Sequence, residues 1–327
     1  MLDLQSKELL MTAGAGGQGV GFVAVANGSN IGAYSKDGKK WEQFTLPQST
    51  NWVDVSYNKG RFVVCSGYSY SGSKKEGAYS DDGGKTWTSV TLPATTQGKV
   101  LSSAGGKFFI VEGRDFLNTN SRGHIWWSED GITWNSCGNF SDIYTPADIC
   151  YGNSVYVLSA TNPGICYKSS DGKSWSKSAT SSNNYSDIGA VFIDGYFYAI
   201  KFSPSYKSID GNTWTSYSMT GVVSVVNSKE NLVQGLVVGD GVYIIRYYST
   251  SSGSALTKYA VSNNLINWDL LTLPVAPASL AFGNGIFVLV GTNTDKTYIS
   301  KDGRTWTLGG VLPKSQNWSC IHYGKDE

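Results

Sequence analysis

Asp54 and Asp148 are the two acidic residues in this chain of 327 residues whose placement could support acid–base chemistry. Each stands three residues before an aromatic residue, Tyr57 or Tyr151, that ends a short apolar segment. If both segments are strands, the carboxylates point the same way, and two carboxylates about 5–10 Å apart can hydrolyse a glycosidic bond. Alternatively, both are polar groups that line a water-filled channel, and we favour this second interpretation.

No other catalytic grouping stands out in the sequence. The only histidines are His124 and His322, and no Ser-His-Asp order suggests a triad. The glycine run from Gly14 to Gly21 lacks the strand and helix that flank a phosphate-binding loop. We therefore expect no enzyme, no catalytic residue and no cofactor.

The cysteines argue against a metal centre or a disulfide framework. Their number is odd, their spacing is irregular and no Cys-x-x-Cys pair occurs. They are Cys65, Cys137, Cys150, Cys166 and Cys320. We expect no metal ligands, and free thiols indicate folding in a reducing compartment.

The candidate residues must be positioned by a repeated unit. Seven short segments begin with Ser, carry an acidic or amide residue two places later and end in Trp. The second copy is one residue longer, and the sixth is degenerate, with Leu265 where the others have Gly. The tryptophans recur from Trp41 to Trp306 at intervals of 38 to 54 residues. This period is typical of a four-stranded propeller blade. The motif residues are Asp37, Asp82, Asp130, Asp171, Asp210, Asn264 and Asp302.

The chemistry of this motif is local and structural. An Asp side chain can accept hydrogen bonds from backbone N–H groups further along its own turn. Glycine adopts the positive φ that a tight turn requires, and the Ser hydroxyl adds a further side-chain bond. The Trp opens the next strand and packs a large apolar face between blades. All seven copies are expected to stabilise the fold without any ligand.

The expected fold is all-β: a seven-bladed β-propeller of four-stranded antiparallel blades. Alternating apolar residues and Gly-containing turns give the strands. The C-terminal segment 317–325 resembles the inner-strand segment 51–59, so we expect it to complete the N-terminal blade and close the ring. A competing interpretation places Glu8–Ala13 in that position. Residues 1–20 are expected to form an N-terminal arm, and residues 21–327 the propeller.

The motif set resembles the Asp-box, or bacterial neuraminidase, repeat. The second copy fits the family pattern in full through Ser80, Asp82, Gly84, Thr86 and Trp87. The resemblance covers essentially the whole chain and implies a sialidase-like propeller fold. It does not imply one function, because such repeats occur in sialidases, other glycosidases, lectins, sorting receptors, assembly factors and virion proteins.

A sialidase site is not expected within this resemblance. The family clamps a carboxylate with three arginines and uses a Tyr nucleophile with a Glu partner. This chain has only five arginines, and two of them lie in or beside tight turns on the wrong face. The family's Phe-Arg-Ile-Pro segment is also absent. The arginines are Arg61, Arg114, Arg122, Arg246 and Arg304.

Charge and composition narrow the partners. The chain has 26 basic and 25 acidic residues, so it lacks the excess of basic residues that binding to nucleic acid or to an anionic membrane surface would require. No secretory signal and no apolar run long enough to cross a membrane are recognised. The uncharged surface, rich in Ser, Thr, Asn, Tyr and Gly, resembles that of bacteriophage virion and tail proteins. We expect a virion location, with a secreted protein as the alternative.

Binding is expected at the end of the propeller opposite the motif turns. The loops there are longer, more varied and rich in residues suited to adaptable polar and sugar contacts. Trp52 and Trp318 are expected near that rim, either stacking on a sugar or packing between blades. The candidate ligand-binding residues are Trp52, Trp318, Asp54, Asp148, Tyr68, Tyr70, Arg114, Tyr144, Tyr185, Tyr247 and Tyr248.

The leading functional hypothesis is a non-enzymatic virion component in the tail or host-attachment apparatus. It would contact a cell-surface glycan or a neighbouring virion subunit. A free-standing carbohydrate-binding lectin is the alternative. A glycosidase that uses the channel-lining acids Asp54 and Asp148 is the third hypothesis.

Overall fold

The computed structural model describes residues 20–67, 75–93, 99–113, 123–141, 143, 145–162, 165–178, 187–201, 204–221, 231–249 and 254–325. The predicted arm, residues 1–20, therefore lies outside the described part except for Val20. The chain divides into two compact units. Of the described residues, the first unit contains those in Thr96–Met219, and the second contains those in Gln18–Thr95 and Thr220–Lys325.

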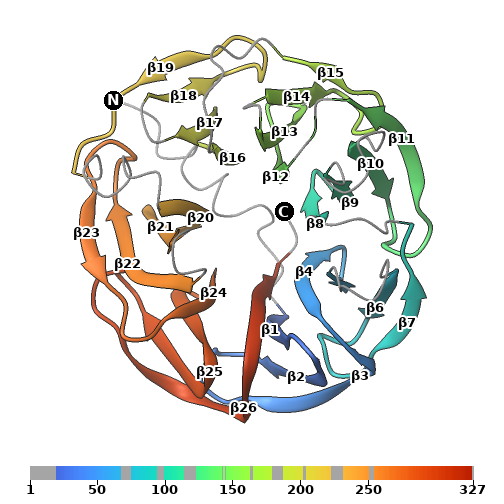
Figure 1. The fold of residues 1–327 in the computed structure, drawn as a ribbon, viewed down its shortest axis with the longest axis vertical. Coiled ribbons are helices and arrows are strands. Elements are labelled where there is room, and N and C mark those ends of the chain that lie inside the picture. Colours follow the sequence, from blue (N-terminus) through green and yellow to red (C-terminus); the bar gives the residue numbers. More distant parts are fainter. Residues whose placement is uncertain are drawn as a thin grey trace. The chain divides into compact units, whose positions relative to one another are not determined.

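The first unit contains three four-stranded antiparallel sheets, each built from consecutive strands (Figure 1). The first sheet is β8 (Lys99–Ala104), β9 (Lys107–Glu112), β10 (Gly123–Ser128) and β11 (Asn135–Phe140). The second is β12 (Thr145–Gly152), β13 (Val155–Asn162), β14 (Ile165–Ser169) and β15 (Ser176–Lys177). The third is β16 (Asp187–Ile193), β17 (Tyr196–Lys201), β18 (Ser205–Ser208) and β19 (Thr215–Tyr217).

The second unit contains two four-stranded sheets and one of six strands. One four-stranded sheet is β4 (Trp52–Asn58), β5 (Arg61–Ser66), β6 (Glu76–Ser80) and β7 (Thr88–Thr91). The other is β20 (Asn231–Gly239), β21 (Val242–Ser249), β22 (Ser254–Ser262) and β23 (Asp269–Thr272). The six-stranded sheet has the order β24 (Pro277–Gly283), β25 (Ile286–Ser300), β26 (Thr307–Gly324), β1 (Gly21–Ala26), β2 (Ser29–Ser35), β3 (Glu42–Thr50).

The prediction of seven four-stranded blades is wrong, because the described strands form six sheets. Strands β25 and β26 are 15 and 18 residues long, and each runs through positions where the sequence predicts two strands. Their ladder continues through the pairs Thr292–Asn317 and Thr294–Gln316, where connecting loops were expected. The last expected blade and the N-terminal one are therefore joined as a single hydrogen-bonded sheet.

The expected partner of the N-terminal strand is present within this sheet. The C-terminal half of β26 pairs antiparallel with β1, from Gly21 opposite Gly324 to Ala26 opposite Trp318. In Figure 1, β26 runs beside β1. The competing segment, 8–13, lies outside the described residues.

All seven motif turns have one hydrogen-bond scheme. The Oδ1 atom of the Asp or Asn accepts from the Ser hydroxyl and from two backbone N–H groups further along the turn. The degenerate sixth copy keeps this scheme through Asn264, with Leu265 at φ +61° in the glycine position. At Gly38, φ is +70° and an added Cβ would lie 2.7 Å from Val288, so the turn packs directly on β25.

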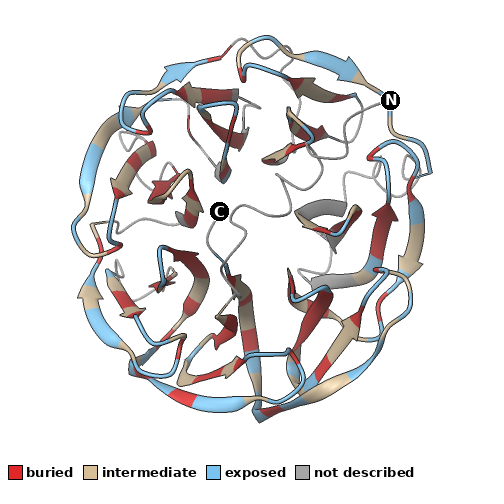
Figure 2. Ribbon diagram, turned by 180° about the vertical axis from the view of Figure 1, so that it is seen from behind, coloured by how far each residue is buried: buried red, intermediate tan, exposed pale blue. Residues whose placement is uncertain are grey.

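The core lies between neighbouring sheets. In the second unit one cluster joins Val23 and Phe44 of the six-stranded sheet to Trp52, Phe62 and other residues of the β4–β7 sheet. Figure 2 shows buried residues concentrated in the strands at one side of each sheet, whereas strands such as β7 and β19 are mostly exposed. Large aromatic and branched side chains supply this packing, because their burial is the main stabilising contribution.

Candidate functional site

Four neighbouring strands of the second unit carry a one-residue bulge at the same register. In β4, β20 and β24 the ladder shifts just before Asp54, Gly235 and Ser279, and in β26 it shifts just before Cys320. Each of the four residues lies four positions before the residue that closes its strand. A bulge re-aims the adjacent side chain, and bulges are frequent next to functional sites. We call Asp54, Ser279 and Cys320, together with Arg246 opposite Gly235, the bulge row.

Hydrogen bonds link three members of the bulge row across three strands. The Cys320 thiol lies 3.6 Å from Oδ1 of Asp54, and the side chain of Ser279 hydrogen-bonds to Cys320. The same Asp54 oxygen accepts the N–H of Val55 at 2.9 Å. Beside them, the bulged Ser319 donates its hydroxyl to the backbone oxygen of Trp52 at 2.6 Å. The row is therefore held at fixed positions on the scaffold.

Arg246 is the fourth member of the row, because residue 235 of β20 is a glycine and has no side chain of its own. It lies on β21 directly opposite Gly235, whose φ is +147°. A Cβ on Gly235 would lie 3.8 Å from Nη2 of Arg246. The guanidinium donates through Nη1 to the backbone oxygen of Ala278 on β24 at 3.1 Å. Its Nε is buried and has no hydrogen-bond partner in the structure.

Burial sets the protonation states around the row. Burial raises the pKa of Cys320, and the neighbouring Asp54 carboxylate raises it further, so the thiol stays protonated at neutral pH. Burial lowers the pKa of His322 to about 4, so this imidazole is neutral at pH 7. Burial also lowers the pKa of Arg246, which remains charged. The row thus combines one cation, one carboxylate and two uncharged donors.

In the first unit, Asp148 lies at the same position relative to a bulge and to the end of its strand. It follows a bulge in β12 and pairs with Ser159, as Asp54 follows a bulge in β4 and pairs with Cys65. Its Oδ1 accepts from the Ser102 hydroxyl on β8 at 2.5 Å and from the N–H of Ile149 at 2.8 Å. Desolvation by the surrounding protein raises the pKa of Asp148. The residue is also exposed to water, which limits this rise.

Trp52 and Trp318 are packing residues in the structure. Their exposed fractions are 0% and 1%, so neither indole offers an open face to a sugar. Each donates its Nε1 hydrogen to a backbone oxygen, Trp52 to Gln48 at 3.3 Å and Trp318 to Thr294 at 3.0 Å. Of the two interpretations offered by the sequence, the geometry favours packing between sheets.

The remaining sequence candidates give no side-chain geometry. Tyr68, Tyr70, Arg114, Tyr144 and Tyr185 lie outside the described residues. Tyr247 and Tyr248 belong to β21, but their side chains are outside the described part. Sequence reasoning missed Cys320 beside Asp54, and Ser279 and Arg246 further along the same row. Both aspartates lie four residues before the last residue of their strands. Counting back by the same distance in β26, β24 and β20 gives Cys320, Ser279 and Gly235.

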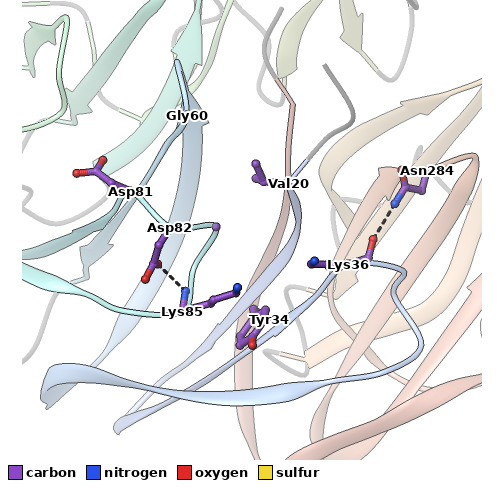
Figure 3. Close-up of a pocket in the computed structure, with 9 residues that line it drawn as sticks. Val20, Tyr34, Lys36, Gly60, Asp81, Asp82, Lys85 and Asn284 are labelled. Atoms are coloured by element: carbon purple, nitrogen blue, oxygen red, sulfur yellow. Dashed lines mark hydrogen bonds between the residues drawn. The ribbon is translucent and has the colours of Figure 1, made fainter. Parts of the chain in front are cut away.

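A pocket of about 550 Å³ lies elsewhere in the second unit, among the first two motif turns and Asn284 (Figure 3). Its carboxylates and its amide already have partners within the fold. Asp81 binds Arg61, Asp82 closes its own turn, and Asn284 donates to the backbone oxygen of Lys36 at 2.7 Å. Lys36 and Lys85 are its basic residues. We therefore take the bulge row, not this pocket, as the candidate functional site.

Among the described residues no group of His, Cys, Asp and Glu is suited to hold a metal ion. Within the same part of the chain, no helix has the length and apolar character needed to cross a membrane. All five cysteines are free.

Solved structures that share the architecture span most of this chain, whereas no family model and no curated protein matches it. A structure of YCF48 bound to a D1 peptide is 16% identical, with 88% of this chain and 83% of that chain covered and a TM-score of 0.53. A streptogramin B lyase is 9% identical, with 84% and 87% covered and a TM-score of 0.60. Virginiamycin B lyase from Staphylococcus aureus is 10% identical, with 91% and 92% covered and a TM-score of 0.57.

These comparisons correct one expectation. The prediction that the chain is not an enzyme is contradicted, because similar structures include lyases, and the missing sialidase residues excluded only one kind of enzyme. At these identities the likeness establishes architecture and carries no activity to this chain. The chain has a β-propeller fold.

Proposed function

We propose that this chain is a ligand-binding β-propeller of the Asp-box type, and that it serves in the tail or host-attachment apparatus of a bacteriophage virion. Its partner is a cell-surface glycan or a neighbouring virion subunit. The bulge row is the part of the described surface that contacts this partner.

The observation that carries the proposal is the contrast between the motif turns and the bulge row. Every motif carboxylate or amide is satisfied by its own turn, so the turns need no ligand. In the bulge row, by contrast, Arg246 and Asp54 are partly exposed, and Nε of Arg246 lacks a partner. Binding sites place a few such polar groups on a rigid scaffold.

The virion assignment is supported by chemistry of the whole chain. The chain is nearly neutral, with 26 basic and 25 acidic residues, which suits contacts that do not depend on long-range electrostatic attraction. The five free thiols are consistent with folding in a reducing cytoplasm before assembly.

Two measurements test this proposal. Mass spectrometry of purified virions from the source phage is expected to detect the chain at a defined copy number, and its absence would remove the virion assignment. A glycan array with the purified chain is expected to give specific hits if the partner is a glycan. Hits without virion association would favour the lectin alternative, and cleavage of a bound glycan would assign an enzymatic role instead.

A further inference from the structure

His124 lies on β10, and both nitrogens of its ring have side-chain partners on β11, the edge strand of the first sheet (Figure 1). Nδ1 is 2.6 Å from Oδ1 of Asn139, and Nε2 is 2.8 Å from Oγ of Ser136. An amide oxygen can only accept, so Nδ1 carries a hydrogen atom and donates it to Asn139. In the neutral ring Nε2 is then the acceptor, and the Ser136 hydroxyl donates to it.

A β-bulge brings Ser136 and Asn139 to the same face of the sheet. Residues three apart on a regular strand face opposite sides, because successive side chains alternate. In β11 the pairing with β10 skips Cys137, which is an extra residue in the ladder. Asn139 therefore pairs with His124, and Ser136 with Trp126, two places further along β10. The bulge thus places a hydroxyl, an imidazole and an amide side by side, although their order along the chain does not group them.

Trp126 fixes the plane of the imidazole. Its ring stacks on that of His124, with centroids 4.2 Å apart and planes inclined by 25°. The indole is itself held through Nε1, which donates to Oε2 of the buried Glu112 at 3.0 Å. The face of an indole attracts a positive charge, so this stack also stabilises an imidazolium formed at His124.

Ser136 is placed to react with a molecule at the surface. The residue is exposed, so the carbonyl carbon of a substrate can reach its Oγ. The N–H of Gly138 donates to the same Oγ at 3.1 Å, which puts a backbone donor beside the atom that forms the new bond. A Cβ on Gly138 would meet nothing within 4 Å, so there is open space on that side. A hydroxyl that donates to an imidazole held by a third group is the arrangement of a nucleophile, its general base and an orienting residue.

From this arrangement we propose that Ser136 and His124 are the catalytic residues of a hydrolytic site for carboxylic esters with a small acyl group, and that Asn139 is a positioning residue. Nε2 of His124 takes the hydroxyl proton as Oγ bonds to the ester carbonyl carbon, and the Gly138 N–H donates to the oxygen that becomes negative. The bond to the alcohol oxygen then breaks, and the imidazolium returns the proton to this leaving group. Water, deprotonated in turn by His124, releases the carboxylic acid and restores Ser136.

Esters suit this site better than amides, because an alcohol leaves more readily than an amine and the described donors to the oxyanion include only one backbone N–H. The exposed position of Ser136 favours a small acyl group on an accessible alcohol. The inference goes beyond the proposed binding function, and the site shares no residue with the bulge row.

Hydrolysis of 4-nitrophenyl acetate by the full chain tests the site. We expect turnover by the wild type, and a loss in kcat/KM of about a hundred-fold or more in both Ser136→Ala and His124→Gln, since the two residues act as a unit. The matched control is Ser216→Ala, which removes an exposed serine of the outer strand β19 and is expected to leave the rate unchanged. No turnover by the wild type, or equal rates in the wild type and Ser136→Ala, would overturn the inference.

Two variants test the role of Asn139. Asn139→Asp keeps an oxygen acceptor for Nδ1 of His124 and is expected to retain most of kcat. Asn139→Leu removes the acceptor and is expected to lower kcat about ten-fold or more with little change in KM, because the imidazole loses its orientation. Equal kcat values in the two variants would overturn the assigned role of Asn139.

Labelling of the wild-type chain keeps the test valid if the variants do not fold. A fluorophosphonate forms a bond to the oxygen of an activated serine with loss of fluoride. Mass spectrometry of the digested protein is expected to find the adduct on Ser136 and not on Ser216. No adduct on Ser136, or equal labelling of both serines, would overturn the inference. The glycan array and the virion analysis test the proposed binding function separately, so the failure of either proposal can be told from that of the other.

Discussion

Replacing Asp82 with alanine removes the acceptor at the centre of one motif turn. Asp82 accepts from the N–H of Lys85 at 3.0 Å, from the N–H and hydroxyl of Thr86 at 2.9 and 2.6 Å, and from the hydroxyl of Ser80 at 2.8 Å. The turn is exposed, so water replaces part of what is lost, and the two backbone bonds contribute about 1 kcal/mol each. We expect Asp82→Ala to destabilise this turn by about 2 kcal/mol.

The neighbouring Asp81 provides the matched control. It is equally a turn carboxylate, but its partner is the side chain of Arg61 in an ion pair at the surface, and such pairs contribute about 0–1 kcal/mol. Hydrogen exchange is the assay, because it reports local opening without assuming two-state unfolding of the whole chain. The reporter is the Gly84 N–H, which donates to Ser80 at 2.9 Å.

Protection of the Gly84 amide is expected to fall roughly thirty-fold in Asp82→Ala, because each 1.4 kcal/mol is a factor of ten. In Asp81→Ala it is expected to change by less than about five-fold, the limit set by a pair of up to about 1 kcal/mol. Equal losses in the two variants would refute the argument, since they would show that the turn is held by charge in general and not by the side-chain-to-backbone bonds.

Three further outcomes follow from the same geometry. Backbone N–H donors lower the pKa of Asp171, Asp210 and Asp302 to about 2. The stability that these carboxylates contribute is therefore present above about pH 4 and is lost as the pH falls toward 2, and acid titration followed by circular dichroism checks this. Burial lowers the pKa of His322 to about 4, so its imidazole resonances in NMR should remain those of the neutral ring at pH 5.5, and protonation there would contradict its burial. Gly38→Ala should cost about 2–4 kcal/mol in urea unfolding, from a positive φ and overlap with Val288, whereas Gly60→Ala, with φ +83° and open space around it, should cost only about 1–2 kcal/mol.

The repeated turn was predictable from sequence because its chemistry is local. Each Ser, Asp and Gly acts within a few residues of itself, and the same hydrogen bonds recur even where Leu265 replaces Gly. The pairing of β1 with β26 was also recognisable, because the segment 317–325 repeats the pattern of 51–59.

The division into sheets was not predictable in the same way. Whether β25 and β26 end between blades depends on backbone pairing such as Thr294 with Gln316, and no local residue pattern marks it. The candidate site shows a similar limit. Arg246 belongs to the row only because Gly235, on another strand, leaves space for its guanidinium, and a single sequence shows no sign of that pairing.

A crystal structure of the full chain with a glycan identified on the array tests the central claim most directly. The account predicts that the glycan binds at the bulge row, beside the partly exposed Arg246 and Asp54. A glycan bound instead in the pocket between the motif turns, at Lys36 and Lys85, would contradict it.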